Sequence, residues 1–494
     1  MEGRTLRREH YYLLVFIVLL ACLAAYRASH ITLDCSIFLS MAHHMQQGRL
    51  LYTGIWDNKP PLTYLLYFLA YSLFPDVRVV HLLRFMAFGF TGLTLTLVLI
   101  RRKDDIKTIV LTMVPALLLL HCLNEQNCSA DLLGLCCFLA FWVAAIYFRS
   151  WAVASFFAAL AVLCKEPFCL VILPWLIQGF WALSESVDSE QLKRRRLGMF
   201  FAFLLPNLIF LAYLLATGTF NDYLYTLAVN FAYSQRKTSQ SIVGFFLFSS
   251  TTGQRLILPL LIFMLYQLVI AWPEGKTEDG VLLFGLVMSA IALSLAKRDY
   301  LNYSVMAFGP IVLALHKLLC TTLEELTKKE WKVRKVVPTL FLAYFASLWI
   351  LLGIMVYQQQ SVAVDFLGWD YWNSYRKNAM FQYLETRVRQ GDGLWLPYGG
   401  LYWLYPALNQ LSPTAMHFYF TSVHGRPNES SRKKLLHYYA EVRSNPPKYI
   451  IDGGTDETAI LLAEPVMRSW LLKNYKKVVK KKSNGDQLVL WQHL

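Results

Sequence analysis

The stretch "YTGIWDNKPPLTYLLY", Tyr52–Tyr67, decides how many times this chain is expected to cross a membrane. An acid, an amide and a lysine at 57–59 are followed by two prolines and an aliphatic and aromatic run. Two prolines suit the first turn of a helix. We interpret residues 60–75 as an amphipathic helix that lies on the outer membrane face. If this segment crossed the membrane instead, the basic segment 101–107 would be external.

The composition predicts a multi-spanning membrane protein. The 494 residues are 56% hydrophobic and 16% charged, whereas soluble domains have about 25% charged residues. The net charge of +15 does not indicate nucleic-acid binding, because most basic residues lie in short runs beside apolar segments. The nine cysteines show no metal-site spacing and are expected to pack as small apolar side chains. Cys122 and Cys128 are the one disulfide candidate.

Eleven apolar runs are candidate membrane spans. They are Tyr11–Tyr26, Val79–Ile100, Thr108–Cys122, Leu132–Phe148, Trp151–Cys164, Phe168–Leu183, Leu197–Thr217, Val243–Trp272, Val281–Ala296, Tyr303–Cys320 and Val336–Tyr357. If they alternate in direction, the basic connecting segments all fall on the side of the N-terminus, which predicts a cytoplasmic N-terminus and an extracytoplasmic C-terminus. The first run resembles a signal peptide, and we interpret it as an uncleaved helix. The expected location is a bacterial inner or plasma membrane.

The composition changes after residue 357. Short strand-like and helix-like segments alternate in 358–494, which predicts a small external α/β domain. We therefore expect a transmembrane catalytic domain at 1–357, with an external loop at 27–78 that carries helices on the membrane surface. The basic helix faces of 358–494 are expected to be solvated, with contact to anionic headgroups or acceptors as the alternative.

Polar residues that interrupt the apolar pattern gather, on this topology, at the outer membrane face. They are Asp34, Asp57, Lys59, Glu125, Asp131, Lys165, Glu166, Arg236, Lys237, Lys297, Arg298, Asp299 and Tyr303. Transporters usually place ionisable groups near the midplane of the membrane, and the predicted span interiors are nearly free of charge. A rim of carboxylates and cations suits an anionic lipid headgroup and a reactive polar partner.

Four segments, in this order, resemble the GT-C class of membrane glycosyltransferases that use polyprenyl-phosphate sugars. They are "LDCSIFLSMAHHMQQGRLLYTGIWDNKPPL", "SADLLGL", "LCKEPFCLVILP" and "LAKRDYLNYSVMAFGP". The chain is most similar to the family of the lipid A aminoarabinose transferase and, more distantly, to the protein O-mannosyltransferases of glycosyltransferase family 39. The resemblance covers roughly the first two thirds of the chain and implies a GT-C fold.

The resemblance also implies roles for the polar residues. Asp34 matches the catalytic carboxylate that acts as general base, and Asp131 is the second catalytic candidate. Lys59, Lys165, Lys297 and Tyr303 match residues that contact the donor phosphate. Arg236 would add a bidentate phosphate contact, and Asp57 would support the site. Without these roles, the acids would act as helix caps, the lysines would extend to headgroups and Tyr303 would be an interfacial aromatic.

The chain departs from the family at two positions. Cys35 follows Asp34 where the family often has Asp-Glu, and Asn58 precedes Lys59 where some relatives have a metal-binding Glu. A divalent metal ion is therefore left open, and its ligands are unknown. No other cofactor is predicted.

The sequence thus predicts an inverting glycosyltransferase. Its expected partners are a polyprenyl-phosphate sugar donor and an external glycolipid, cell-wall glycan or protein acceptor, and nucleic acid is not expected. A multi-spanning lipid or solute transporter is the alternative, although no pair of inverted repeats is evident. An O-antigen ligase or polymerase is a third option, but these carry a large external loop between late spans.

Overall fold

The computed structural model describes most of the chain. The described residues are 7–25, 31–102, 105–123, 128–182, 189–235, 252–271, 277–295, 301–327, 336–360, 374–397, 401–414, 429–453, 465–483 and 486–494. The chain forms two compact units. The first unit comprises Met1–Arg27, Arg84–Phe210 and Lys237–Ala363, and the second comprises Ala28–Leu83, Leu211–Arg236 and Val364–Leu494.

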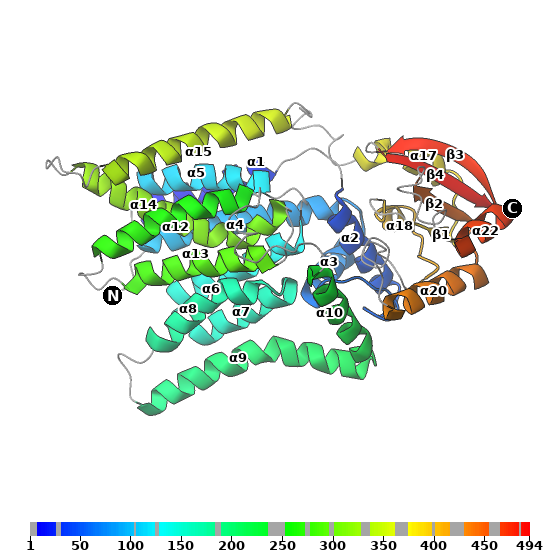
Figure 1. The fold of residues 1–494 in the computed structure, drawn as a ribbon, viewed down its shortest axis with the longest axis horizontal. Helices are drawn as coiled ribbons and strands as arrows, with labels where there is room; N and C mark the ends of the chain where they lie inside the picture. Colours follow the sequence, from blue (N-terminus) through cyan, green and yellow to red (C-terminus); the bar gives the residue numbers. More distant parts are fainter. Residues whose placement is uncertain are drawn as a thin grey trace. The chain divides into compact units, whose positions relative to one another are not determined.

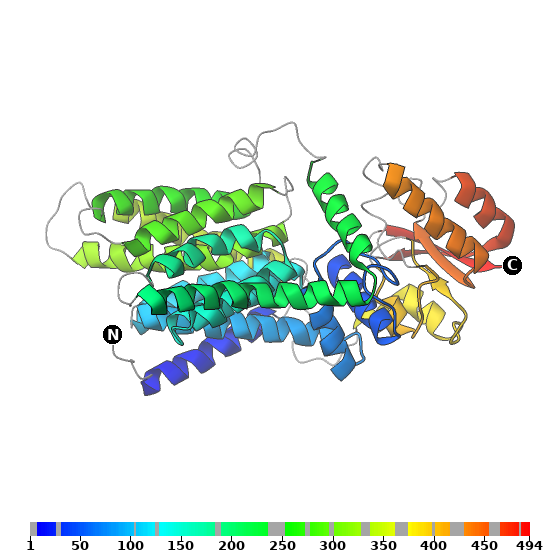
Figure 2. The same cartoon turned by 90° about the horizontal axis from the view of Figure 1, so that it is seen from below.

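Helices build the first unit, and they run roughly parallel to one another in two perpendicular views (Figure 1, Figure 2). They are α1 (Arg8–Ala25), α4 (Val79–Arg102), α5 (Ile106–Leu123), α6 (Ala130–Ile146), α7 (Trp151–Cys164), α8 (Phe168–Ala182), α9 (Ser189–Ala216), α12 (Thr252–Ala271), α13 (Thr277–Leu295), the 3-10 helix η2 (Leu301–Ala307), α14 (Phe308–Thr327) and α15 (Val336–Gln360). Every apolar run that the sequence predicted overlaps one or two of these helices. Parts of some runs, such as residues 243–251, lie outside the described residues.

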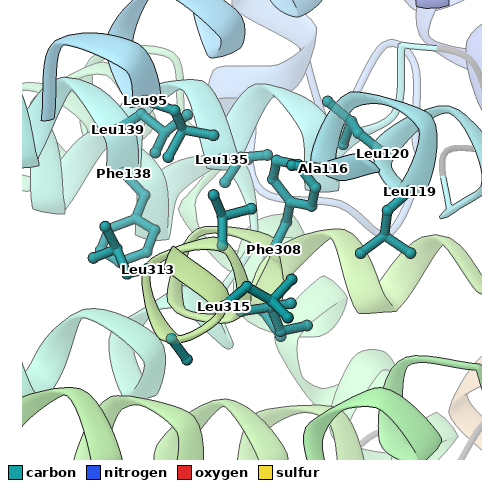
Figure 3. Close-up of a cluster of buried hydrophobic side chains, with 14 of the residues drawn as sticks. Leu95, Ala116, Leu119, Leu120, Leu135, Phe138, Leu139, Phe308, Leu313 and Leu315 are labelled. Atoms are coloured by element: carbon teal, nitrogen blue, oxygen red, sulfur yellow. The ribbon is translucent and has the colours of Figure 1, made fainter. Parts of the chain in front are cut away.

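The core of the first unit lies where α4, α5, α6 and α14 meet. Leu95, Ala116, Phe138 and Phe308 point toward one another there, and all four are at least 95% buried (Figure 3). Small residues bring the helices close together, as is common in membrane bundles. A Cβ on Gly309 would lie 2.9 Å from the ring of Trp142, so α14 requires glycine at this contact with α6.

Six described helices are long and apolar enough to cross a membrane. They are Arg8–Ala25, Val79–Arg102, Ile106–Leu123, Glu190–Ala216, Glu278–Leu295 and Tyr303–Thr327. Six further apolar helices of 10–17 residues accompany them, which supports a helical, multi-pass membrane protein. The segment predicted as a surface helix is α3 (Pro61–Leu73), with a proline in its first turn. Because α7 is about as short as α3, helix length does not decide whether α3 crosses, and the number of spans stays a prediction.

The second unit combines helices with a four-stranded sheet. Besides α3 it contains α2 (Leu33–Gln46), α10 (Phe220–Gln235), η4 (Ser374–Lys377), α17 (Ala379–Glu385), β1 (Leu394–Trp395), α18 (Leu404–Ala407), α20 (Glu429–Ser444), β2 (Tyr449–Gly453), α22 (Pro465–Asn474), β3 (Tyr475–Ser483) and β4 (Asp486–His493). The strand order is β1-β2-β4-β3. β1 and β2 are parallel, and the other two pairs are antiparallel.

The described residues after 374 contain both strands and helices, and one strand among them was not expected. Whether they form a separate external domain stays a prediction. β3, "YKKVVKKKS", was not predicted, because its lysines hide the apolar alternation of a strand. Lysine is common on edge strands, where it discourages pairing with another chain, and β3 lies at an edge of the sheet. The division of the chain at 357/358 stays a prediction; the structure groups 364–494 with 28–83 and 211–236.

Within the second unit, α2 is joined to a segment more than 360 residues later in the chain. His43 Nε2 lies 3.0 Å from the carbonyl oxygen of Gln410. His44 Nε2 accepts the backbone N–H of Ser412 at 2.8 Å, and its Nδ1 lies 2.7 Å from the carbonyl oxygen of Ser40. These two adjacent histidines are therefore buried structural residues. All nine cysteines are free, so the disulfide considered between Cys122 and Cys128 does not form.

Candidate functional site

The loop between α2 and α3 is held in place by tyrosines. Tyr52, which is 1% exposed, has a φ of 73°, a backbone conformation unusual for a residue other than glycine. Its hydroxyl donates to the carbonyl of Lys59 at 3.0 Å, and the backbone N–H of Lys59 donates to the hydroxyl of Tyr64 at 2.9 Å. The segment that carries the "DNK" triplet is thus a fixed part of the second unit.

Asp57 is the buried acid of this loop. It is 1% exposed, and Tyr64 donates its hydroxyl to Asp57 Oδ2 at 2.6 Å. Burial raises the pKa of the Asp57 carboxyl, while the Lys59 charge and the Tyr64 hydrogen bond oppose part of that shift. The charge of Asp34 adds to the increase. The charges of Asp34 and Lys59 thus both act on the buried Asp57, and we call these three residues the loop site.

Asp34 is not the cap of its helix. The N-cap of α2 is Thr32, and Asp34 lies half-buried in the first turn of the helix. Similarly, the N-cap of α6 is Ser129, whose hydroxyl accepts the backbone N–H of Leu132, so Asp131 is not the cap of α6. The capping interpretation of both acids is wrong. Both acids lie in the first turn of their helices, where a carboxylate interacts favourably with the helix dipole.

A tyrosine that the sequence did not indicate also lies near the loop site. Tyr402 is 1% exposed, and burial raises the pKa of its phenol well above the ordinary value. Tyr405 and Asp57 add smaller electrostatic contributions in the same direction. Tyr402 is 345 residues from Asp57 in the chain, so no local pattern could have linked the two. Tyr64 was within reach of sequence reasoning, because it stands five residues after Lys59.

Three of the predicted site residues meet in the first unit. Lys165, the C-cap of α7, places its Nζ 3.1 Å from both carboxylate oxygens of Asp131 in the first turn of α6. The same Nζ lies 4.1 Å from the ring centroid of Tyr303 in η2, which is a cation–π distance. Asp131 is fully buried and Lys165 is 8% exposed. Lys165 is thus held by a carboxylate and a ring and does not extend to the headgroups.

Two predicted site residues, Arg236 and Lys297, lie outside the residues that the structure describes. Within the described ranges, no group of three or more His, Cys, Asp or Glu side chains could hold a metal ion. The described part of the loop site therefore does not fit a metal centre, and no step of a reaction is assigned to one here.

Comparison with other proteins adds no assignment. No protein-family model matches the chain, and a search of curated proteins finds no match.

Proposed function

We propose that this chain is an integral-membrane glycosyltransferase of the GT-C type, with about eleven spans. It transfers one sugar from a polyprenyl-phosphate donor to an acceptor outside the cytoplasm. The observation that carries the proposal is the loop site, where Asp57 is 1% exposed and accepts the Tyr64 hydroxyl at 2.6 Å, two residues before Lys59. This loop belongs to the longest of the four segments that resemble the family.

A buried acid in such a loop calls for a functional explanation. Burying a carboxylate costs free energy unless the group is paired and hydrogen-bonded. An aspartate in a loop avoids this cost when its side chain is exposed to solvent. Acids with pKa values raised by burial and by a neighbouring acid are concentrated at functional sites. Tyr64 and Lys59 compensate part of the cost, so the loop maintains a polar centre in an otherwise aromatic environment.

In the proposed reaction, Asp34 accepts the proton of the acceptor hydroxyl. The acceptor oxygen attacks the anomeric carbon while the bond from that carbon to the phosphate oxygen breaks. The electron pair of the broken bond stays on the polyprenyl phosphate, and the anomeric configuration is inverted. Lys59 stabilises the negative charge on the phosphate as it leaves. Asp57 supports the site: it interacts electrostatically with Lys59, and the Tyr64 hydroxyl holds its carboxyl in place.

The cluster in the first unit has a related role in this proposal. The resemblance to the family assigns Lys165 and Tyr303 to the donor phosphate. Within the first unit, Asp131 fixes the position of the Lys165 ammonium group beside the Tyr303 ring. Arg236 and Lys297 are assigned to the same phosphate from the sequence alone. The acceptor is a glycolipid, a cell-wall glycan or a protein.

The alternative is a lipid or solute transporter. Transporters carry ionisable residues within the spans, on the substrate pathway. Asp131 and Lys165 instead stand at the first turn and the C-cap of their helices. This placement favours the enzyme.

The test is sugar transfer by Asp34→Asn in detergent, with a polyprenyl-phosphate sugar as donor. Loss of a general base lowers rates by about 10²–10⁴-fold, and we expect a loss in this range. Asp76→Asn is the matched control, because Asp76 belongs to the same unit and pairs with Arg78 outside the loop site. Full activity of a well-folded Asp34→Asn variant would rule out the assignment. Unchanged envelope glycans together with altered solute uptake in cells lacking the gene would favour the transporter.

A further inference from the structure

The first unit contains a cavity of about 480 Å³ that the proposed function does not use. Four cations line it, Arg101, Arg102, Arg149 and Lys317, together with the aromatic side chains of Trp151 and Trp175. The cavity thus has cationic groups on part of its lining and an aromatic surface on another part.

This cavity lies far from the Asp131–Lys165 pair. The pair is at the start of α6 and the end of α7, whereas Arg149 lies in the turn that joins the two helices and Trp151 is the first residue of α7. α6 has 17 residues and is therefore about 26 Å long. The two sites are at opposite ends of the same helical hairpin, so a ligand in one does not contact the other.

The charges of the cavity are only partly balanced. Lys317 forms an ion pair with Asp279 at 3.1 Å. Glu278 and Glu324 also line the cavity. Glu278 and Asp279 act on the charge of Arg102, but neither Arg101 nor Arg102 forms a side-chain hydrogen bond or an ion pair within 4.0 Å of a described residue. Two guanidinium groups therefore remain available to an anion.

Arg149 occupies a position that would favour glycine. Its φ of 49° is in the left-handed region, in the turn between α6 and α7. A guanidinium group offers a planar pair of N–H donors that matches two phosphate oxygens. The aromatic part of the lining suits the apolar portion of a lipid next to its headgroup.

We propose that this cavity binds the phosphate group of an anionic membrane lipid. The arginines take the phosphate oxygens, and Trp151 and Trp175 contact the adjacent glycerol and upper acyl chain. The proposal is independent of glycosyl transfer, because it concerns the opposite end of the α6–α7 hairpin.

The test measures thermal unfolding of the purified full chain in detergent with added phosphatidylglycerol, phosphatidylcholine or inorganic phosphate. We expect phosphatidylglycerol to raise the unfolding temperature by several degrees and phosphatidylcholine to have little effect. The double variant Arg101→Gln/Arg102→Gln should lose most of this increase in the unfolding temperature.

Arg194→Gln is the matched control. Arg194 is an exposed arginine on α9 that pairs with Glu190 and does not line the cavity. Phosphatidylglycerol should raise the unfolding temperature of this variant as much as that of the original chain. An unchanged shift in the double variant, or an equal loss in the control, would overturn the proposal. If inorganic phosphate alone reproduces the shift, the ligand is a free phosphate and the lipid assignment is wrong.

Discussion

Lys165 Nζ lies 3.1 Å from both carboxylate oxygens of Asp131, and the two side chains are 10% and 1% exposed. This pair joins the end of α7 to the start of α6 within the first unit. Breaking a buried ion pair from one side leaves an uncompensated charge and costs about 3–5 kcal/mol. Replacing both partners by neutral groups of similar shape removes that penalty.

We expect Lys165→Met to lower the free energy of unfolding by about 3–5 kcal/mol, and Asp131→Asn to lower it by a similar amount. The double variant Asp131→Asn/Lys165→Met should lose much less than the sum of the two. A double-mutant cycle of unfolding midpoints measures the coupling between them. Additive losses would mean that the two side chains do not stabilise each other.

The raised pKa of Asp57 gives a pH-dependent prediction. A carboxyl whose folded pKa is above its unfolded value binds more protons in the folded state, so stability falls as pH rises from about 3.8 through the folded pKa. Asp57→Asn removes this dependence and still accepts the Tyr64 hydrogen bond through its amide oxygen. At pH 7 we expect the variant to be at least as stable as the original chain. At pH 3.5 we expect the variant to be no more stable than the original chain. Unfolding temperatures at several pH values test this, and a variant less stable at pH 7 would contradict it.

Gly54 is required by the loop between α2 and α3. A Cβ at this position would lie 2.9 Å from the backbone nitrogen of Leu50, which cannot move without shifting the chain. We expect Gly54→Ala to destabilise the protein by about 1–3 kcal/mol. Gly280→Ala in α13 is the control, because no atom of the described residues lies within 4 Å of its added Cβ, apart from its chain neighbours and the backbone of its own helix. The control should be neutral or slightly stabilising in the same thermal unfolding measurement.

Lys59 gives a prediction about donor affinity. A charge-assisted hydrogen bond contributes about 1.5–3 kcal/mol, which corresponds to about a 10- to 150-fold change in a binding constant. We expect Lys59→Gln to raise the KM for the polyprenyl-phosphate donor by such a factor, with Lys59→Arg less affected. Lys107→Gln, an exposed lysine at the start of α5, should leave KM unchanged. An unaltered KM in Lys59→Gln would exclude the contact.

The long helices of the first unit were predictable, because the length and hydrophobicity of each apolar run indicate a helix. α10 was not predicted. The strands β1, β2 and β4 were predictable from short apolar runs between turn signals. β3 was not, because its lysines carry the signature of a solvated edge. Similarly, residues 57–59 marked a polar centre, but nothing local in the sequence indicated that Asp57 would be fully buried.

The partners of the site residues were harder to predict. Lys165 and Asp131 are 34 residues apart, and their pairing depends on how α6 and α7 pack. Tyr402 reaches the vicinity of Asp57 only through the tertiary structure of the second unit. Local sequence patterns show which residues are unusual for their surroundings. They do not show which distant segments come into contact in the folded chain.

The hydrogen bonds of His43 and His44 to residues 410 and 412 have a consequence for synthesis. A ribosome that adds about 5–20 residues per second needs roughly 20–70 s to make the intervening segment. For that time α2 has been made, but the partners of its two histidines do not yet exist. The contacts of α2 with residues 410 and 412 are therefore completed late in synthesis. A chain that stops before residue 401 leaves the two histidines of α2 without their native acceptor and donor.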